Sequence, residues 1–104
     1  MHDDAINRFV LLILLQAKND HASEVVIDAS VDSKAAIKYE VDGTWYEIAQ
    51  PPSSILPSVS AELRRLAGIT QEKREGVIET DYSGDHLRWK VVNDVESRFT
   101  LAPA

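Results

Sequence analysis

Basic side chains in the second half of the chain are the residues best suited to bind an anion. Arg64, Arg65, Lys73 and Arg74 lie close together in sequence, and Lys90 follows in a later segment. Guanidinium and ammonium groups recognise phosphate and carboxylate groups through charge-assisted hydrogen bonds. Glutamates are interleaved with these residues, a pattern that is typical of solvated surface. The five basic residues are therefore weak candidates for an anion-binding patch.

The sequence offers little for catalysis or for metal binding. His2, His21 and His86 fall at the terminus, at a helix end and at a turn, and no G-x-S-x-G nucleophile motif is present. Asp81, Asp85 and His86 surround one turn in no recognised order of metal ligands. No glycine precedes a lysine, as the phosphate-binding loop of a P-loop ATPase requires. We therefore expect no enzymatic activity, no cofactor and no metal.

Composition places the chain among small globular domains. Its 104 residues are 44% hydrophobic, which indicates one domain over 1–104 with a single core. The 17 acidic and 11 basic residues give a net charge of −6, whereas a nucleic-acid-binding surface needs dense positive charge. The apolar run 9–15 is too short to span a bilayer and follows acidic residues, unlike a signal peptide. Because the chain also lacks cysteine, we expect a cytoplasmic protein with no nucleic-acid partner and no membrane insertion.

Periodicity and turn residues predict two helices and six strands. Helix 4–19 has apolar residues at i, i+3 and i+4 spacing, and a second helix follows Ser53 or Ser54. This second helix has Pro57 in its first turn and Gly68 at its end. The strands are predicted over 24–29, 34–41, from 44 to a stop at 51–52, 76–82, 86–92 and 95–101. The order αβββαβββ indicates an α+β fold, in which two helices pack on one face of an antiparallel sheet of about six strands.

Short turns fix the strand register. Asp42-Gly43 predicts a two-residue hairpin, and Ser83-Gly84 predicts another. A further turn at Asn93-Asp94 is expected before the last strand. The first hairpin pairs Val41 with Thr44, Tyr39 with Tyr46 and Ile37 with Ile48 on a face expected to line the core. The second hairpin pairs Ile78 with Trp89, Thr80 with Leu87 and Glu79 with Arg88.

The first predicted helix is apolar on more than one side. Its main apolar face contains Val10 and Ile13, whereas Leu11, Leu12 and Leu15 fall on the opposite side. Three exposed leucines would form a patch typical of protein interfaces, so we treat these residues as interface candidates. The alternative is that the curved sheet or the last strand covers this side of the helix.

Four segments occur in the order and approximate spacing of a known family. They are A-S-E-V-V-I-D over 22–28, I-K-Y-E-V-D-G over 37–43, L-A-G-I over 66–69, and E-K-R followed by G-V-I over 72–78. They resemble the A-S-D-I-H-I-E, R-x-R-x-D-G, M-A-G-L and E-R-R…G-R-I motifs of the N-terminal, PAS-like domain of the type II secretion and type IV pilus ATPases. The similarity covers about residues 5–92 and implies a PAS-like fold.

The chain departs from this family where nucleotide is bound. The resemblance implies that two positions of the R-x-R-x-D-G strand contact nucleotide held by a neighbouring subunit, and Lys38 and Glu40 replace the two arginines here. Val26 replaces the family's histidine, and the segment between E-K-R and G-V-I is shorter. The motor half with its Walker motif is not in these 104 residues. The resemblance therefore implies the scaffold rather than nucleotide chemistry.

We accordingly expect a non-catalytic protein-interaction or regulatory module. Its partner would be a motor ATPase or a second copy of the chain, as in a homodimer. One alternative is a domain that contacts nucleotide in trans within a hexameric secretion ATPase, through Arg64, Arg65, Arg74 or Lys90. Another alternative is a small acidic secretion chaperone that dimerises through apolar surface. The chain is either a stand-alone protein or a fragment of a longer ATPase.

Overall fold

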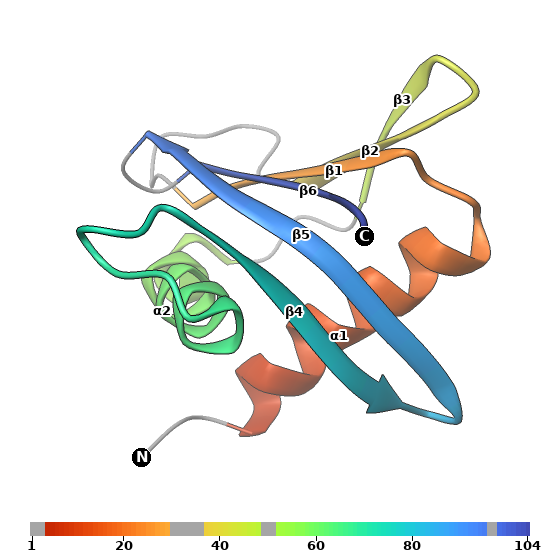
Figure 1. The fold of residues 1–104 in the computed structure, drawn as a ribbon. Helices are drawn as coiled ribbons and strands as arrows, with labels where there is room; N and C mark the ends of the chain where they lie inside the picture. The colour runs from red at the N-terminus through yellow and green to blue at the C-terminus, as the bar shows by residue number, and fades with distance from the viewer. Residues whose placement is uncertain (1–3, 30–36, 49–51, 96–97) are drawn as a thin grey trace.

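Two helices lie under one six-stranded sheet (Figure 1). The computed structural model describes residues 4–29, 37–48, 52–95 and 98–104. Helix α1 spans Asp4–Asn19 and helix α2 spans Leu56–Ala67. The strands are β1 Glu24–Asp28, β2 Ile37–Val41, β3 Thr44–Glu47, β4 Glu75–Tyr82, β5 Asp85–Val95 and β6 Arg98–Pro103. The predicted α+β class and the order αβββαβββ are confirmed.

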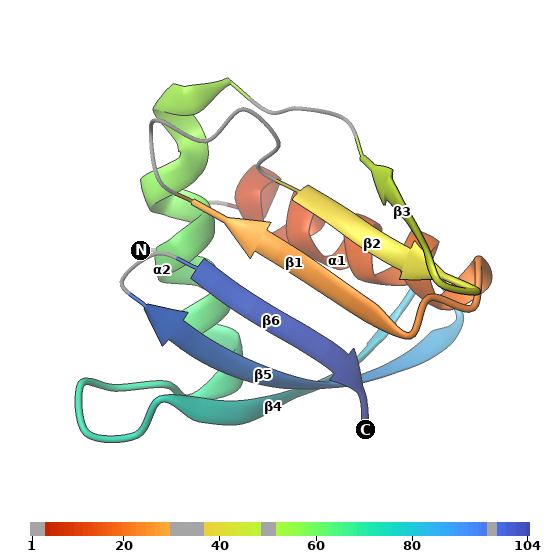
Figure 2. The same ribbon diagram turned by 90° about the horizontal axis from the view of Figure 1, so that it is seen from above.

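All strand pairs are antiparallel, and the strands follow the order β3-β2-β1-β6-β5-β4 across the sheet. Figure 2 shows β1 and β6 side by side in the middle of the sheet. The strands before α2 and the strands after it therefore join into one sheet only through the β1–β6 pairing. As a consequence, β3 and β4 are the two edge strands.

The two predicted hairpin turns are confirmed. Their central residues have positive φ, 51° and 82° at Asp42-Gly43 and 54° and 85° at Ser83-Gly84. Positive φ at both central residues is the pattern of the type I′ turn, whose twist matches that of the flanking strands. The observed register pairs Tyr39 with Tyr46, Val41 with Thr44, Ile78 with Trp89, Thr80 with Leu87 and Glu79 with Arg88, as predicted.

The connection into the last strand differs from the prediction. Asn93 and Asp94, expected to form a turn, lie inside β5, which continues to Val95. A register shift between Asn93 and Val95 marks a β-bulge, where the Asn93 side-chain amide donates a hydrogen bond of 2.9 Å to the Arg98 carbonyl. The bulge gives the polar Asn93 side chain a hydrogen-bond partner inside the strand. The strand β5 therefore continues past Asn93, and β6 begins at Arg98 rather than at residue 95.

Helix α2 begins later than predicted and ends as predicted. A 3₁₀ turn spans Ser53–Ile55, and Ile55 rather than a serine is the N-cap, with no side-chain cap hydrogen bond. Pro57 lies in the first turn, where its missing N–H has no helical partner to lose. Gly68 ends the helix in the left-handed conformation, with φ of 71°.

Gly76 of β4 packs directly against the end of α2. A Cβ atom added at Gly76 would lie 1.9 Å from the Ala67 carbonyl oxygen. Real Cβ atoms do not approach oxygen this closely, so any side chain at this position would push β4 away from the end of the helix. The glycine therefore sets the spacing between these two elements.

The core lies between the helices and the inner face of the sheet. Val10 and Leu14 of α1, and Leu63 of α2, are fully buried against β-strand residues such as Ile27 and Phe99. Neither helix in the described parts of the chain is long and apolar enough to cross a bilayer. Residues 34–36 of the second predicted strand and 49–51 at the end of the third lie outside the described residues.

Candidate functional site

The β3 edge of the sheet presents two large aromatic side chains to solvent. All four residues of β3 are exposed, and Trp45 and Tyr46 retain 43% and 49% of their accessible surface. Successive strand residues point to opposite faces, so the two rings lie on opposite sides of the sheet. The β2–β3 hairpin rises away from the helices in Figure 1, and β3 is exposed along its whole length whereas β2 is partly buried.

This exposure corrects one expectation from the sequence. The pairs Ile37–Ile48, Tyr39–Tyr46 and Val41–Thr44 share the inner face, as predicted, but only the β2 members Ile37 and Tyr39 are buried. Thr44 and Tyr46 are exposed, as are the other two residues of β3. The alternation of residues along β2 and β3 correctly predicted which side chains share the inner face of the sheet. It did not predict which of these side chains are buried.

On the outer face, Trp45 lies beside a cation. The Lys38 ammonium nitrogen is 5.4 Å from the centroid of the Trp45 ring, within the range of a cation–π interaction. Lys38 belongs to β2, so this contact directs its ammonium group towards the free edge of the sheet. The edge therefore combines an aromatic surface with a positive charge.

On the inner face, Tyr46 borders a shallow hollow of about 320 Å³ with Asp20, Tyr39 and Val41. The Tyr46 and Tyr39 rings meet edge to face, with centroids 6.3 Å apart and an interplanar angle of 77°. The Tyr39 hydroxyl donates a hydrogen bond to the Asp20 carboxylate. This hydrogen bond, together with burial and the Asp20 charge, raises the pKa of Tyr39 above its ordinary value of 10.0. The hollow is thus held in shape by a fixed tyrosine and offers the exposed Tyr46 ring.

The two positions that the resemblance associates with nucleotide contact serve the hairpin instead. Lys38 lies over Trp45, as described above. Glu40 accepts a hydrogen bond of 2.9 Å from the Ser23 hydroxyl at the start of β1. A carboxylate in this place repels phosphate, so these side chains position the sheet edge rather than an anion.

The three interface candidates of α1, Leu11, Leu12 and Leu15, differ in how far they are buried. Leu11 is 6% exposed and belongs to the core, Leu15 is partly buried against it, and Leu12 is 54% exposed. The expected patch of three neighbouring exposed leucines is therefore wrong for the folded chain. The fold buries Leu11 and partly buries Leu15, so most of this side of the helix is covered. Leu12 remains as an isolated exposed apolar residue.

The basic residues fall into separate places. Arg64 and Arg74 line one hollow of about 290 Å³ with Thr70, Gln71 and Asn93. The Arg64 guanidinium also lies 5.5 Å from the centroid of the buried Phe99 ring. Arg65 instead forms hydrogen bonds of 2.8 and 2.6 Å with Glu62, and Lys73 and Lys90 do not line the hollow. The structure therefore brings together two of the five anion-patch candidates.

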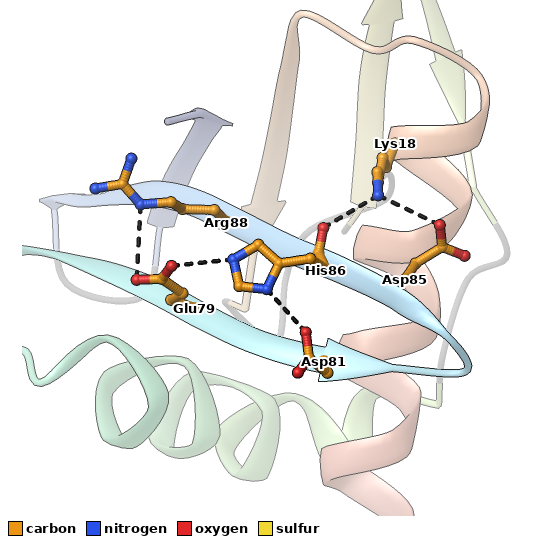
Figure 3. Close-up of polar contacts among 6 residues, drawn as sticks. All are labelled: Lys18, Glu79, Asp81, Asp85, His86 and Arg88. Carbon is orange, nitrogen blue, oxygen red and sulfur yellow. Dashed lines mark hydrogen bonds and ion pairs between the residues drawn. The ribbon is translucent and has the colours of Figure 1, made fainter.

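The outer face of the β4–β5 hairpin carries a chain of ion pairs (Figure 3). The His86 ring nitrogens lie 2.8 Å from Asp81 Oδ1 and 3.0 Å from Glu79 Oε2, and Arg88 Nε lies 3.7 Å from the other Glu79 oxygen. These hydrogen bonds, that to Asp81 first, raise the pKa of His86 above 6.5. Among the residues that the structure describes, no cluster of three or more histidine and acidic side chains is arranged to hold a metal ion. Asp81 is directly opposite His86, and Glu79 is directly opposite Arg88, in the β4–β5 ladder. We therefore interpret these four side chains as cross-strand pairs on the charged surface of the hairpin.

Sequence comparisons provide no relative for this site. No protein-family model matches the chain, and no curated protein matches it in sequence. The sequence signal that could have pointed to the β3 edge was the Asp42-Gly43 turn followed by a short aromatic strand before a proline pair. That local pattern does not predict the order of strands across the sheet, which is what makes β3 an edge strand.

Proposed function

We propose that this chain is a non-catalytic protein-interaction module that contacts its partner through the edge of β3. The observation that carries the proposal is the exposure of all four β3 residues, among them Trp45 and Tyr46, at an open edge of the sheet. An open edge can accept a further strand through main-chain hydrogen bonds. Tyrosine and tryptophan are the residues most enriched among those that dominate binding energy at interfaces.

The polar groups around this edge support a structural role. The Asp20 carboxylate accepts a hydrogen bond from Tyr39, and Glu40 accepts one from Ser23. Both acids thus fix the position of the hairpin relative to α1 and β1. A preorganised edge loses little conformational freedom when a partner binds, which favours recognition.

The sequence resemblance suggests the class of partner. On the motifs of residues 22–78, we propose a motor ATPase of the secretion or pilus type as the first partner to test, in the cytoplasm. The chain would act on the motor by surface contact, as a separate protein or as the front part of a longer one.

The experiment compares partner binding by the wild-type chain and by the double variant Trp45→Ala/Tyr46→Ala. Val77→Ala is the matched control, because Val77 is an exposed apolar residue on β4, the opposite edge strand. We expect the double variant to keep the circular dichroism of the wild type and to bind a motor ATPase of the same organism at least tenfold more weakly. Equal binding by all three proteins, or no binding by the wild type, would overturn this function for the edge.

A second candidate function rests on Arg64 and Arg74, which line the same hollow. Two guanidinium groups at one opening can bind the phosphates of a nucleotide held by a neighbouring subunit. Calorimetric titration with ATP and magnesium, in the presence and absence of a motor domain, tests this function. We expect heat that Arg74→Gln abolishes, and the absence of heat in both mixtures would exclude it.

A further inference from the structure

We propose that the β3 edge pairs with the β3 edge of a second copy, so that the two sheets join across a two-fold axis. The axis passes between Tyr46 and Tyr46 of the second copy. This inference rests on the proposed function, since it takes the same edge as the contact surface, and it makes a second copy of the chain, rather than a motor ATPase, the occupant of that edge.

The backbone of β3 defines which groups are free to pair. The Ile48 N–H donates a hydrogen bond of 3.0 Å to the Ile37 carbonyl, which makes this pair a hydrogen-bonded position of the β2–β3 ladder. Hydrogen-bonded and non-hydrogen-bonded positions alternate along an antiparallel pair. The main-chain groups of Thr44 and Tyr46 therefore face β2, whereas those of Trp45 and Glu47 face outward.

Only one register uses all of these outward groups. In an antiparallel sheet, directly opposite residues lie on the same face, so Trp45 can pair with Glu47 of the second copy or with Trp45 itself. The second register would pair Glu47 with Gly43, which has φ of 82° and belongs to the turn rather than to the strand. The first register pairs both Trp45 and Glu47 fully and contains no turn residue.

The side chains agree with this register. On the inner face, Tyr46 lies opposite Tyr46 of the second copy at a non-hydrogen-bonded position, where Cα atoms are about 4.5 Å apart and side chains are closest. Aromatic pairs at such positions stabilise a sheet. The half-exposed Tyr46 ring, already held against Tyr39, would lose its solvent-exposed surface there.

Charge complementarity on the outer face favours a second copy as the occupant. In this register Glu47 lies opposite Trp45 of the second copy, and that ring is covered by its own Lys38 ammonium at 5.4 Å. Lys38 is directly opposite Glu47 of its own hairpin, and the second copy brings its Glu47 to the other side of the same cation. The two-fold axis repeats the contact, so that the edge complements itself.

Single cysteines provide a direct test, because the chain has no cysteine of its own. Disulfides form between residues whose Cα atoms are about 4.4–6.8 Å apart. We expect Tyr46→Cys to form a covalent dimer under mild oxidation, and Trp45→Cys and Val77→Cys to remain monomeric under the same conditions. Linkage at residue 45 as fast as at residue 46 would overturn the proposed register.

Sedimentation of the reduced protein tests the association without a cross-link. We expect a mass that rises with concentration, and we expect Tyr46→Lys to weaken dimerisation by about tenfold or more, because it places like charges at the axis. Val77→Lys, the control on the other edge, should sediment as the wild type does. A wild-type chain that stays monomeric at all concentrations would overturn the inference. If such a monomer still binds a motor ATPase and the double variant Trp45→Ala/Tyr46→Ala fails to bind it, the proposed function stands and the pairing of two copies is excluded.

Discussion

The Asn7 side-chain amide donates a hydrogen bond of 2.7 Å to Glu62 Oε2 and so links α1 to α2. Glu62 is only 5% exposed, and its carboxylate also accepts two hydrogen bonds from Arg65. Burying a carboxylate is unfavourable unless it is hydrogen-bonded, so the packing of the two helices depends on these contacts. Glu62 therefore stabilises the contact between α1 and α2 at the edge of the hydrophobic core.

Asn7→Ala should therefore lower the free energy of unfolding by about 1–3 kcal/mol, because it removes a donor from a buried carboxylate. Denaturant unfolding of Asn7→Ala, Glu62→Ala and the double variant should give a coupling of about 0.5–3 kcal/mol. Glu72→Ala, in an exposed loop, is the control and should change stability by less than about 0.5 kcal/mol. Strictly additive effects of the two substitutions would contradict the link.

The two adjacent leucines of α1 should respond very differently to substitution. Leu11→Ala should cost about 2–5 kcal/mol of stability, because Leu11 belongs to the core and its loss leaves a cavity. Leu12→Ala should change stability by about 0.5 kcal/mol or less, since Leu12 is exposed. Chemical denaturation of both variants measures the difference. Similar losses for the two would show that α1 is rotated relative to the structure described here.

Gly76→Ala should destabilise the chain by at least about 1–3 kcal/mol, the usual cost of forcing extra volume into packed structure. The added Cβ meets the Ala67 carbonyl oxygen at 1.9 Å, which is a backbone atom and cannot rotate away. Removing the Ala67 side chain in the double variant Gly76→Ala/Ala67→Gly should therefore not restore stability. Thermal melting of the wild type and these two variants tests this, and a full rescue would place the conflict with the Ala67 side chain instead.

His86 should make stability depend on pH. Asp81 and Glu79 raise its pKa in the folded chain above the unfolded value of about 6.5. The folded state then binds the proton more tightly, so this contribution is complete below pH 6.5 and is lost as pH rises through the folded pKa. Denaturation midpoints across this range should fall more steeply for the wild type than for His86→Gln. Parallel profiles for the two proteins would exclude the effect, and the histidine resonances in NMR titrations report the pKa directly.

Much of the fold could be predicted because it is encoded locally. The Asp42-Gly43 and Ser83-Gly84 turns require positive φ, and this fixed both hairpin registers residue by residue. Gly68 likewise ended α2 where predicted. Asn93 was misread because an asparagine suits both a turn and a bulge, and the bulge is seen only in the structure, where its side chain donates a hydrogen bond to the Arg98 carbonyl and its main-chain N–H donates one to the Arg74 carbonyl.

The candidate site was less accessible to sequence reasoning. Leu11 and Leu12 are identical in type and adjacent in sequence, and only the packing of α1 in the folded chain decides that Leu11 is buried while Leu12 is exposed. Trp45 and Tyr46 became candidates only once β3 was found at the edge, because the open main-chain groups beside them depend on the order of strands across the sheet. Arg64 and Arg74 met at one hollow for a similar reason, since α2 and the start of β4 are brought together across a loop.

The sequence by itself determined the elements, their order and the pairing within each hairpin, because turn geometry and periodicity act over a few residues. Tertiary structure decided the pairing of β1 with β6, which separates the sheet's centre from its edges. That pairing joins the strands that precede α2 to those that follow it, and its stability comes from apolar burial summed over both hairpins and both helices. No local sequence pattern specifies the total apolar burial of the folded chain. The exposure of Trp45 and Tyr46 is therefore decided by the tertiary structure.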